Sequence, residues 1–457
     1  MKPLSALDQL FLWLEANHRP MHVGGLTLFS FPEDAGDDHM ARVMEQLRAH
    51  EQVNAPFNQR LTKQLGQWGW VTDEALDMGH HLRLEALPGP GRIRELLSFV
   101  SNEHSHLMDR DRPLWEFHVI EGLQDRRFAF YVKFHHAFVD GISAMRVFDR
   151  MVCEDPDERD MLPFWALPRR SRGGDDLDGS ISQTLQYLLR SSGRQIATLP
   201  GVARELFHLV QRTRDEADGL GLPSAPPAIL NQRITNARRF AAQSWSLSRF
   251  REIGHAFGAT VNDVVLAICG HALRRYLQQR NELPQRSLIA MVPISLHDQQ
   301  NEQDDGNRVG TLLTPLATDT EDPLERLARI RESTQHGKAR YACMSAEEIL
   351  NYNALMLAPT CFNLLTGMAP SWQAFNVIIS NVPGPRKPVY WNGARMEGMY
   401  PVSIPFDRLA LNITLTSYCD EIEFGLIGCR RTLPSLQKLL GFLEEGLESL
   451  EQHCDRD

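Results

Sequence analysis

Two adjacent histidines followed by an acid and a glycine form the pattern in this sequence best suited to chemistry. His135 and His136 end an apolar segment, and Asp140 and Gly141 follow after a short spacer. An imidazole can act as a general base near neutral pH, and a strand end holds such a base rigidly. A carboxylate in the next turn can hold the loop in shape, and glycine permits a tight backbone turn. The pattern predicts a histidine base between a strand and a helix.

Other catalytic or metal patterns are weaker. The GxSxG motif is absent, so a mechanism without a covalent enzyme intermediate is the simplest. The 7 cysteines are scattered without a CxxC pair, which fits a reducing compartment, and we expect no bound metal. His80 and His81 have no Asp-Gly after them and are interpreted as structural or exposed. His104 and His106 form an HxH within a helical pattern without acidic or cysteine partners.

The elements that position the histidine pair are a mixture of strands and helices. Alternation and aromatic content predict strands, and apolar residues at helical spacing predict helices. Strands are expected at 22–31, 114–123, 126–134, 287–296, 308–317, 375–380, 408–418 and 421–429. Helices are expected at 4–14 with Ser5 as a possible N-cap, at 93–109, 141–153 and 249–258, at 261–280 capped by Thr260, and at 434–453.

Length and charge bound the organisation of the chain. Its 457 residues predict two or three domains. The similar mixture of strands and helices in the two halves predicts an α+β fold with a cleft between them, with 1–160 and 229–457 as domains and 161–228 as a linker. An acidic chain attracts neither nucleic acid nor anionic lipid in bulk, and we expect no nucleic-acid partner. No apolar run is long enough for a transmembrane helix, and the N-terminus does not resemble a signal peptide.

Two segments have unusual compositions. Ile181 to Arg214 is a basic amphipathic stretch, which fits either a membrane-surface helix or a helix packed across the domain junction. Ile349 to Pro385 contains no charged residue and no histidine, although 23% of the chain is charged. The second stretch fits a buried core segment, and it fits equally a lining for a long apolar ligand or a membrane-touching surface.

The histidine motif resembles the HHxxxDG motif of the coenzyme A-dependent acyltransferase superfamily. The rest of the chain resembles the bacterial wax ester synthase/acyl-CoA:diacylglycerol acyltransferase family within it. The matching segments are Pro113-Leu114-Trp115, Asn262-Asp263, Asn381-Val382-Pro383-Gly384-Pro385, Met21-His22-Val23-Gly24-Gly25 and 231–239 (NQRITNARR). They lie in the family's order over nearly the whole chain. The DFGWG motif of other acyltransferases of the superfamily is absent, and 407–418 occupies that late region.

This resemblance implies two chloramphenicol-acetyltransferase-like domains with a substrate tunnel at their interface. It implies transfer of a long-chain acyl group from acyl-CoA, a co-substrate, to a long-chain alcohol or diacylglycerol, without a permanently bound cofactor. It also implies a cytoplasmic enzyme that associates peripherally with the membrane or with lipid inclusions.

The resemblance also assigns roles to residues. His136 is the expected general base, with His135 supporting its position and Gly141 closing the motif. Asp140 is expected to be structural, facing an arginine such as Arg308. Substrate-binding roles are expected for Asn262, Asp263, Pro113, Leu114, Trp115, Asn381, Pro383 and Gly384. Asn262 is a candidate oxyanion donor, Asn262 and Asp263 can equally be first-turn helix residues, and Trp115 is expected to shape the pocket by packing.

Two other functions are compatible with the same motif. An amide-forming condensation domain shares HHxxxDG, but it usually adjoins carrier domains, and this chain has none. A non-catalytic lipid-inclusion coat protein that kept the fold would tolerate loss of the PLW, ND and double-histidine motifs, and all three are present.

Overall fold

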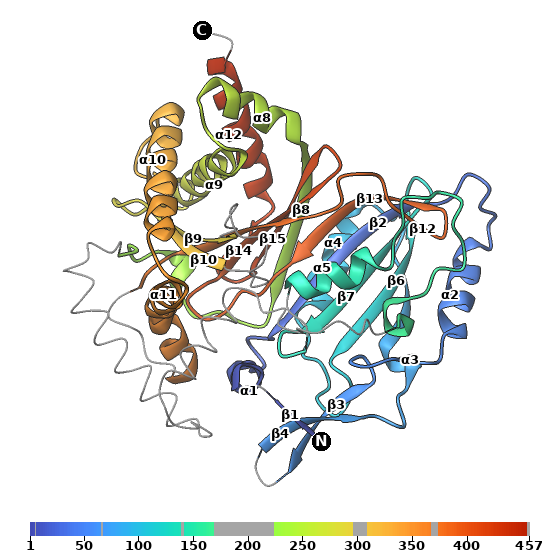
Figure 1. The fold of residues 1–457 in the computed structure, drawn as a ribbon. Coiled ribbons are helices and arrows are strands. Elements are labelled where there is room, and N and C mark those ends of the chain that lie inside the picture. The colour runs from blue at the N-terminus through green and yellow to red at the C-terminus, as the bar shows by residue number, and fades with distance from the viewer. Residues whose placement is uncertain are drawn as a thin grey trace.

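The structure is a computed structural model that describes residues 1–4, 6–64, 67–138, 141–168, 224–295, 309–366 and 373–454. Strands within these residues form two six-stranded sheets and a small three-stranded one. Figure 1 shows the two large sheets next to each other, with the blue and cyan first half on one side and the lime to red second half on the other. The expected mixed α+β fold with two sheet-rich halves is confirmed.

The first sheet holds the strand that carries the histidine pair. Its order is β12-β13-β2-β7-β6-β5. The bounds are β2 His22–Ser30, β5 Leu82–Ala86, β6 Trp115–Leu123, β7 Arg127–His135, β12 Tyr390–Trp391 and β13 Ala394–Val402. β7 is central, with β2 and β6 antiparallel on its two sides. The strands expected at 22–31, 114–123 and 126–134 are therefore found within one residue of their expected ends.

The second sheet is covered on one face by long helices. Its order is β10-β9-β11-β14-β15-β8. The bounds are β8 Arg238–Ser246, β9 Ile289–Ser295, β10 Val309–Pro315, β11 Val377–Pro383, β14 Leu411–Tyr418 and β15 Glu421–Cys429. In Figure 1, α8 (Leu247–Ala256), α9 (Val261–Gln278), α10 (Pro323–Ala342) and α12 (Lys438–Cys454) gather beside this sheet. Thr260 caps α9 as expected, because its hydroxyl accepts a hydrogen bond from the backbone N–H of Asp263.

The second half lends two strands to the first sheet. β13 pairs antiparallel with β2, and β12 pairs with β13 at the sheet edge. Figure 1 shows orange β13 beside blue β2. Residues 390–402 therefore belong structurally with the first half, although the expected second domain is 229–457. The domain limits at 160 and 228 remain predictions.

The two halves also contact each other away from the strands β12 and β13. α4 (Ile93–Glu103) lies against β8, where the Ser101 hydroxyl accepts a hydrogen bond from the Phe240 N–H at 2.8 Å. Leu96, Val100 and Ile427 pack in one buried cluster with Phe240. An apolar core of this kind holds the halves together as one body.

The remaining elements surround the first sheet and the junction. They are β1 Lys2–Pro3, β3 Gln59–Gln64, β4 Gln67–Thr72, α1 Ala6–Leu14, α2 His39–Ala49, α3 Met78–His81, α5 Gly141–Asp149, α11 Ala346–Thr366 and the short 3₁₀ turns Phe164–Ala166 and Ile229–Asn231. Figure 1 places α1 at the base of the molecule, between the first sheet and α11. None of the described helices is both long and apolar enough on its own to cross a membrane; α8 and α9 meet both conditions only when taken together, and they are bent by 100°.

Several sequence-based expectations concern residues outside the described ranges. These are the Ser5 cap, Asp140, the basic stretch 181–214 and the arginine partner Arg308. They stay predictions.

Candidate functional site

The histidine pair lies where three segments of the first half meet. His135 is the last residue of β7, and its N–H donates to the carbonyl of Leu114 at 3.1 Å. The N–H of His136 donates to the carbonyl of Met21 at 2.8 Å. His135 is also directly opposite His22 in the β2–β7 ladder. Two of the family-like segments, MHVGG and PLW, therefore hold the backbone of the pair from its two sides.

The ring of His135 is fixed and buried. Its Nδ1 accepts a hydrogen bond from the N–H of Ala137 at 3.1 Å, so the proton of a neutral ring is on Nε2. That Nε2 faces Oε1 of Glu15 at 3.2 Å, and the His135 side chain is 0% exposed. The ring is thus enclosed by protein, with Nδ1 bonded to Ala137 and Nε2 next to the Glu15 carboxylate.

Glu15 anchors this arrangement from the end of α1. Its carboxylate is 2% exposed and also pairs with Arg110, with an N–O distance of 2.8 Å, and it accepts a hydrogen bond from the Met21 N–H at 3.2 Å. Burial alone would raise the pKa of Glu15, but His135 and Arg110 outweigh it and lower the pKa to about 2. Sequence reasoning missed this role. The available signal was an acid at the end of an apolar helical pattern.

The ring of His136 is placed differently. His136 is partly exposed, and its ring stacks on Phe11 of α1 with centroids 4.1 Å apart and planes 23° from parallel. The stack fixes the ring plane while leaving part of the residue open to a substrate. Gly141, from the same motif, begins α5.

The PLW segment packs beneath the pair. Leu114 and Trp115 are both 0% exposed, and Trp115 is opposite Phe134 in the β6–β7 ladder. The indole Nε1 donates to the Phe57 carbonyl at 2.7 Å, and the ring stacks on His81 at 4.4 Å. Trp115 is thus a packing residue in an aromatic core, and His81 is a structural histidine.

The ND segment is the first turn of α9. The carboxylate of Asp263 accepts hydrogen bonds from the Thr260 N–H at 2.9 Å, the Thr260 hydroxyl at 2.7 Å and the Thr334 hydroxyl at 2.7 Å. Asp263 therefore takes part in a capping box and contacts α10. This is the structural role expected of a residue in the first turn of a helix. Asn262 is partly exposed, and within the described ranges its side chain makes no hydrogen bond.

The NVPGP segment is the connection by which the chain leaves the second sheet for the first. Asn381 and Pro383 are exposed residues at the end of β11. A side chain at Gly384 would place its Cβ 2.4 Å from the Ser417 carbonyl oxygen, so the crossover needs glycine there. The substrate-binding role of this segment remains a prediction.

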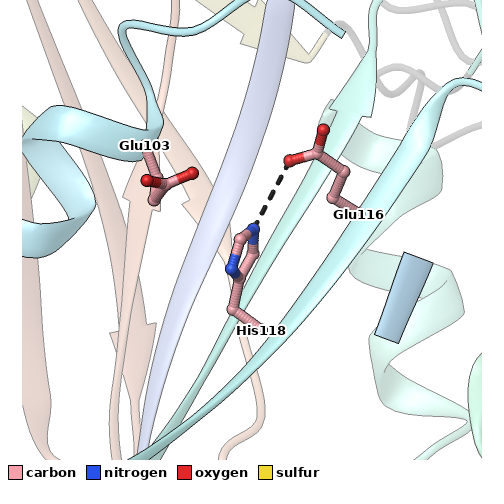
Figure 2. A group of neighbouring side chains, drawn as sticks. All are labelled: Glu103, Glu116 and His118. Atoms are coloured by element: carbon pink, nitrogen blue, oxygen red, sulfur yellow. Dashed lines mark hydrogen bonds and ion pairs between the residues drawn. The ribbon is translucent and has the colours of Figure 1, made fainter. Parts of the chain in front are cut away.

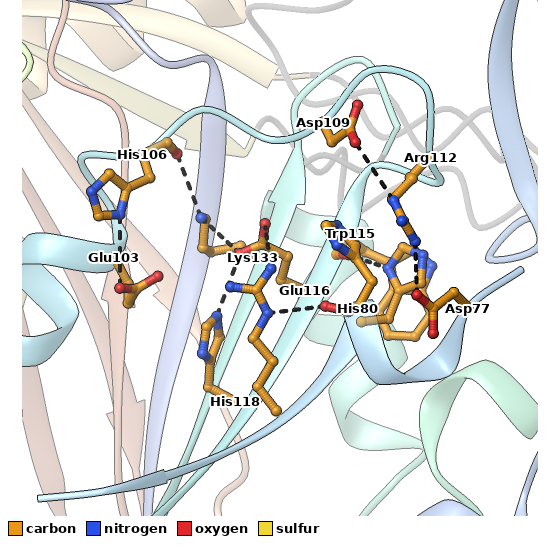
Figure 3. A network of polar contacts seen from close by, with 12 residues as sticks. Asp77, His80, Glu103, His106, Asp109, Arg112, Trp115, Glu116, His118 and Lys133 are labelled. Carbon is orange, nitrogen blue, oxygen red and sulfur yellow. Dashed lines mark hydrogen bonds and ion pairs between the residues drawn. The ribbon is translucent and has the colours of Figure 1, made fainter.

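A buried polar network occupies the sheet face that also carries His135. Lys133 and Glu116 are opposite each other on β7 and β6, with their side chains paired at 2.9 Å. Figure 2 shows His118 between Glu116 and Glu103, and these three offer ligand atoms within 4.8 Å of one another. Figure 3 shows Lys133 reaching the same Glu116 carboxylate. The buried ammonium group already supplies the positive charge that a metal ion would bring.

His104 of the HxH pair also has a structural role. His104 is buried, and its Nδ1 lies 2.8 Å from the Tyr131 hydroxyl and its Nε2 3.0 Å from the Ser403 carbonyl oxygen. A carbonyl oxygen only accepts, so Nε2 carries the proton and the Tyr131 hydroxyl donates to Nδ1. His104 thereby links the first half to the chain just after β13, and burial lowers its pKa to about 3.

The charge-free stretch contributes to an apolar cluster beside His136. Residues of α11 and the following chain pack there with Phe11, Leu114 and Ala137. The contributors from the stretch are Met356, Leu357, Cys361, Phe362, Ala374, Phe375 and Ile378. Phe11 thus contacts the His136 ring and also belongs to the cluster. Whether this cluster surrounds a ligand tunnel stays a prediction.

Known protein families and relatives match this chain over most of its length. The model of the wax ester synthase/diacylglycerol acyltransferase catalytic domain matches residues 4–265, and that of the WS/DGAT C-terminal domain matches residues 305–451. An O-acyltransferase WSD from Acinetobacter baylyi is 44% identical over 99% of this chain and 97% of its own length. A probable diacylglycerol O-acyltransferase from Mycobacterium tuberculosis is 42% identical over 97% of this chain and 98% of its own.

Solved structures give the same result. The wax ester synthase/diacylglycerol acyltransferase from Marinobacter aquaeolei VT8 superposes with a TM-score of 0.85 at 55% identity, covering 100% of both chains. The first condensation domain of the calcium-dependent antibiotic synthetase matches with a TM-score of 0.59 at 15% identity over 99% of this chain and 96% of its own, which shows a shared fold alone. The chain belongs to the wax ester synthase/diacylglycerol acyltransferase family of O-acyltransferases.

Proposed function

We propose that this protein transfers a long-chain acyl group from acyl-CoA to the hydroxyl of a long-chain alcohol or of diacylglycerol, with His136 as the general base. One observation carries the assignment of the base. The His135 side chain is 0% exposed, with Nδ1 bonded to Ala137 and Nε2 next to Glu15, whereas His136 is partly exposed beside an apolar cluster. A base must reach the proton that it removes, and of the two histidines His136 meets this requirement.

The proposed reaction needs no covalent enzyme intermediate. His136 takes the hydroxyl proton of the acceptor as the oxygen attacks the thioester carbonyl carbon. The new C–O bond forms, the C–S bond then breaks, and the thiolate of CoA leaves. His136 returns the proton to that sulfur, so the products are the ester and free CoA, and the histidine is neutral again.

The other residues have supporting roles in this proposal. Glu15 and His135 position the backbone from which His136 projects, and Phe11 orients its ring. Asn262 remains proposed as a donor near the reacting oxygens, because its amide is uncommitted within the described residues. Asp140 is proposed to hold the loop.

The apolar cluster is proposed to receive the acyl chain or the alcohol chain. Support comes from its position, since Phe11 joins it to His136, and from the absence of charge in α11 after Glu348. Substrates of this kind reside in membranes or lipid inclusions. Peripheral contact with such a surface is therefore part of the proposal.

The direct test is a reaction of purified protein with palmitoyl-CoA and hexadecanol, followed by free thiol release and ester formation. Diacylglycerol and a long-chain amine serve as alternative acceptors. We expect thiol release that depends on a hydroxyl acceptor, and no acyl adduct in the intact mass after incubation with donor alone. Thiol release with the amine but with neither hydroxyl acceptor would favour an amide-forming condensation domain. No thiol release with any acceptor would favour a non-catalytic coat protein.

A further inference from the structure

Basic side chains from three segments gather near Asp407 at the junction of the halves. We call Arg19, Arg238, Arg408 and His18 the arginine cluster. Arg19 and His18 pair with Asp407, Arg238 donates to the backbone of His18, and Arg408 follows Asp407 in the chain. Asp407 lies 3.1 Å from His18 Nε2 and 3.4 Å from a guanidinium nitrogen of Arg19. Within the described residues, no other carboxylate pairs with a member of the cluster.

The cluster is tightly built. Arg238 is 3% exposed and donates to the backbone carbonyl of His18 at 3.0 Å. Arg408 has a φ of 66°, which is a strained backbone conformation for a residue with a side chain, in a two-residue turn between Phe406 and Leu409. Strain of this kind concentrates at functional sites.

Hydrogen-bonding capacity is left over in the cluster. The Nε atoms of Arg19 and Arg408 are buried, and neither has an acceptor in the described part of the chain. A buried donor without an acceptor is unfavourable, because it has lost its hydrogen bonds to water without replacement. The guanidinium of Arg408 makes only a weak contact, 3.5 Å from the Asn231 carbonyl oxygen.

The positive charges also act on one another. Burial lowers the pKa of Arg19, Asp407 opposes the shift, and the nearby charge of Arg233 adds to it. Burial likewise lowers the pKa of Arg238 to about 10. An anion bound here would relieve the repulsion and supply the missing acceptors. In a chain with a net charge of −10, such a local concentration of cations is distinctive.

The cluster is connected to the proposed base by a short stretch of backbone. Arg19 pairs with Ala16 in the turn between α1 and β2, and Met21 two residues later accepts the hydrogen bond from the His136 N–H. Two extended residues span at most about 7 Å. An anionic group on a flexible arm can therefore rest at the cluster while the other end of the same molecule reaches His136.

We propose that the arginine cluster binds phosphate groups of the acyl-CoA donor. Guanidinium groups suit phosphate because they offer several donors in one plane. CoA carries its phosphates at the end opposite the thioester, so the cluster would hold one end of the donor while His136 acts at the other. This inference rests on the proposed function, because it assumes that CoA is the donor.

The test compares two donors that differ in phosphate. Palmitoyl-CoA carries the phosphates, and S-palmitoyl-pantetheine has the same thioester without them. For Arg408→Gln we expect KM for palmitoyl-CoA to rise about tenfold, with KM for the pantetheine thioester unchanged. Arg408→Lys should recover part of the loss. Arg329→Gln is the control, because Arg329 on α10 pairs with Asp319 at 3.0 Å and Glu325 at 3.5 Å, away from the cluster.

A purely structural role of the arginines predicts a different result. The arginines would then only hold three backbone segments together, and Arg408→Gln would lower the melting temperature or change the KM values for both donors equally. Either an equal change or no change in the two KM values overturns the inference. If wild-type protein turns over neither donor, the proposed function fails instead.

A second measurement uses the unaltered protein. Adenosine 3′,5′-bisphosphate should compete with palmitoyl-CoA and not with S-palmitoyl-pantetheine; no competition with either would contradict the inference. A lipid phosphate is the other possible source of the anion. Sedimentation with phosphatidylglycerol vesicles separates the two sources, because loss of vesicle binding in Arg408→Gln with unchanged KM for palmitoyl-CoA would assign the cluster to lipid headgroups and overturn the proposal.

Discussion

The buried pairing of Glu15 makes a quantitative prediction about stability and pH. Its pKa falls from 4.5 to about 2 because His135 and Arg110 stabilise the carboxylate. A lowered pKa stabilises the folded protein above the unfolded pKa, and this stabilisation is lost as the pH falls toward the folded value. At about 1.36 kcal/mol per pKa unit, the shift corresponds to about 3 kcal/mol at pH 7. The same linkage leaves less than half of this at pH 3.

The perturbation is Glu15→Gln, which keeps the shape of the side chain and removes its charge. We expect this variant to lose about 3 kcal/mol of unfolding free energy at pH 7, and the difference from wild type to shrink to less than half by pH 3. Urea unfolding followed by fluorescence at both pH values measures the difference. Because both proteins share every other titrating group, the difference between them reports Glu15 together with its pairing to His135 and Arg110.

A surface pair provides the matched control. Glu325→Gln removes a carboxylate that is 53% exposed and that pairs with Arg329 at 3.5 Å on α10. We expect a loss below about 0.5 kcal/mol, because exposed ion pairs contribute little. A loss below about 1 kcal/mol for Glu15→Gln at pH 7, or a loss that is the same at pH 7 and pH 3, would refute the argument that Glu15 anchors the histidine pair.

Three further substitutions test other parts of the structure. Thr260→Ala removes the cap of α9 and should lower the unfolding free energy by about 1 kcal/mol; an unchanged urea midpoint would argue against the capping box. Gly384→Ala places a Cβ against the Ser417 carbonyl oxygen and should destabilise by about 1–3 kcal/mol, so a wild-type melting temperature would contradict the close approach. Leu357→Ala opens space in the cluster beside His136 and should shift activity toward longer acyl-CoA chains; an unshifted chain-length profile across a donor series would count against a lining role.

The strands and the histidine position could be predicted because both are local properties. Alternation of apolar residues reports which side chains are buried, so β6 and β7 were predictable to within a residue of their ends. The pair at the end of β7 and the cap of α9 were predictable in the same way. For Trp115, its size and apolar surface pointed to the packing role that the structure shows.

Contacts between distant segments could not be predicted. Glu15 meets Arg110 and His135 only because the sheet brings α1 beside the end of β7. The local sequence of 390–402 does not indicate that its strand β13 pairs with β2 in the other half. The arginine cluster likewise joins three separate segments, each of which looks ordinary alone. Pairing partners are set by the whole fold, and a local pattern does not encode them.

The central claim is that His136 is the base, and one rate measurement tests it most directly. Ester formation from palmitoyl-CoA and hexadecanol should fall at least about 100-fold in His136→Ala, with an unchanged melting temperature. His106→Ala provides the control, because that side chain is 58% exposed and its ring faces Glu103. This control should keep the wild-type rate. A folded His136→Ala protein that forms ester within a few-fold of the wild-type rate would contradict the account.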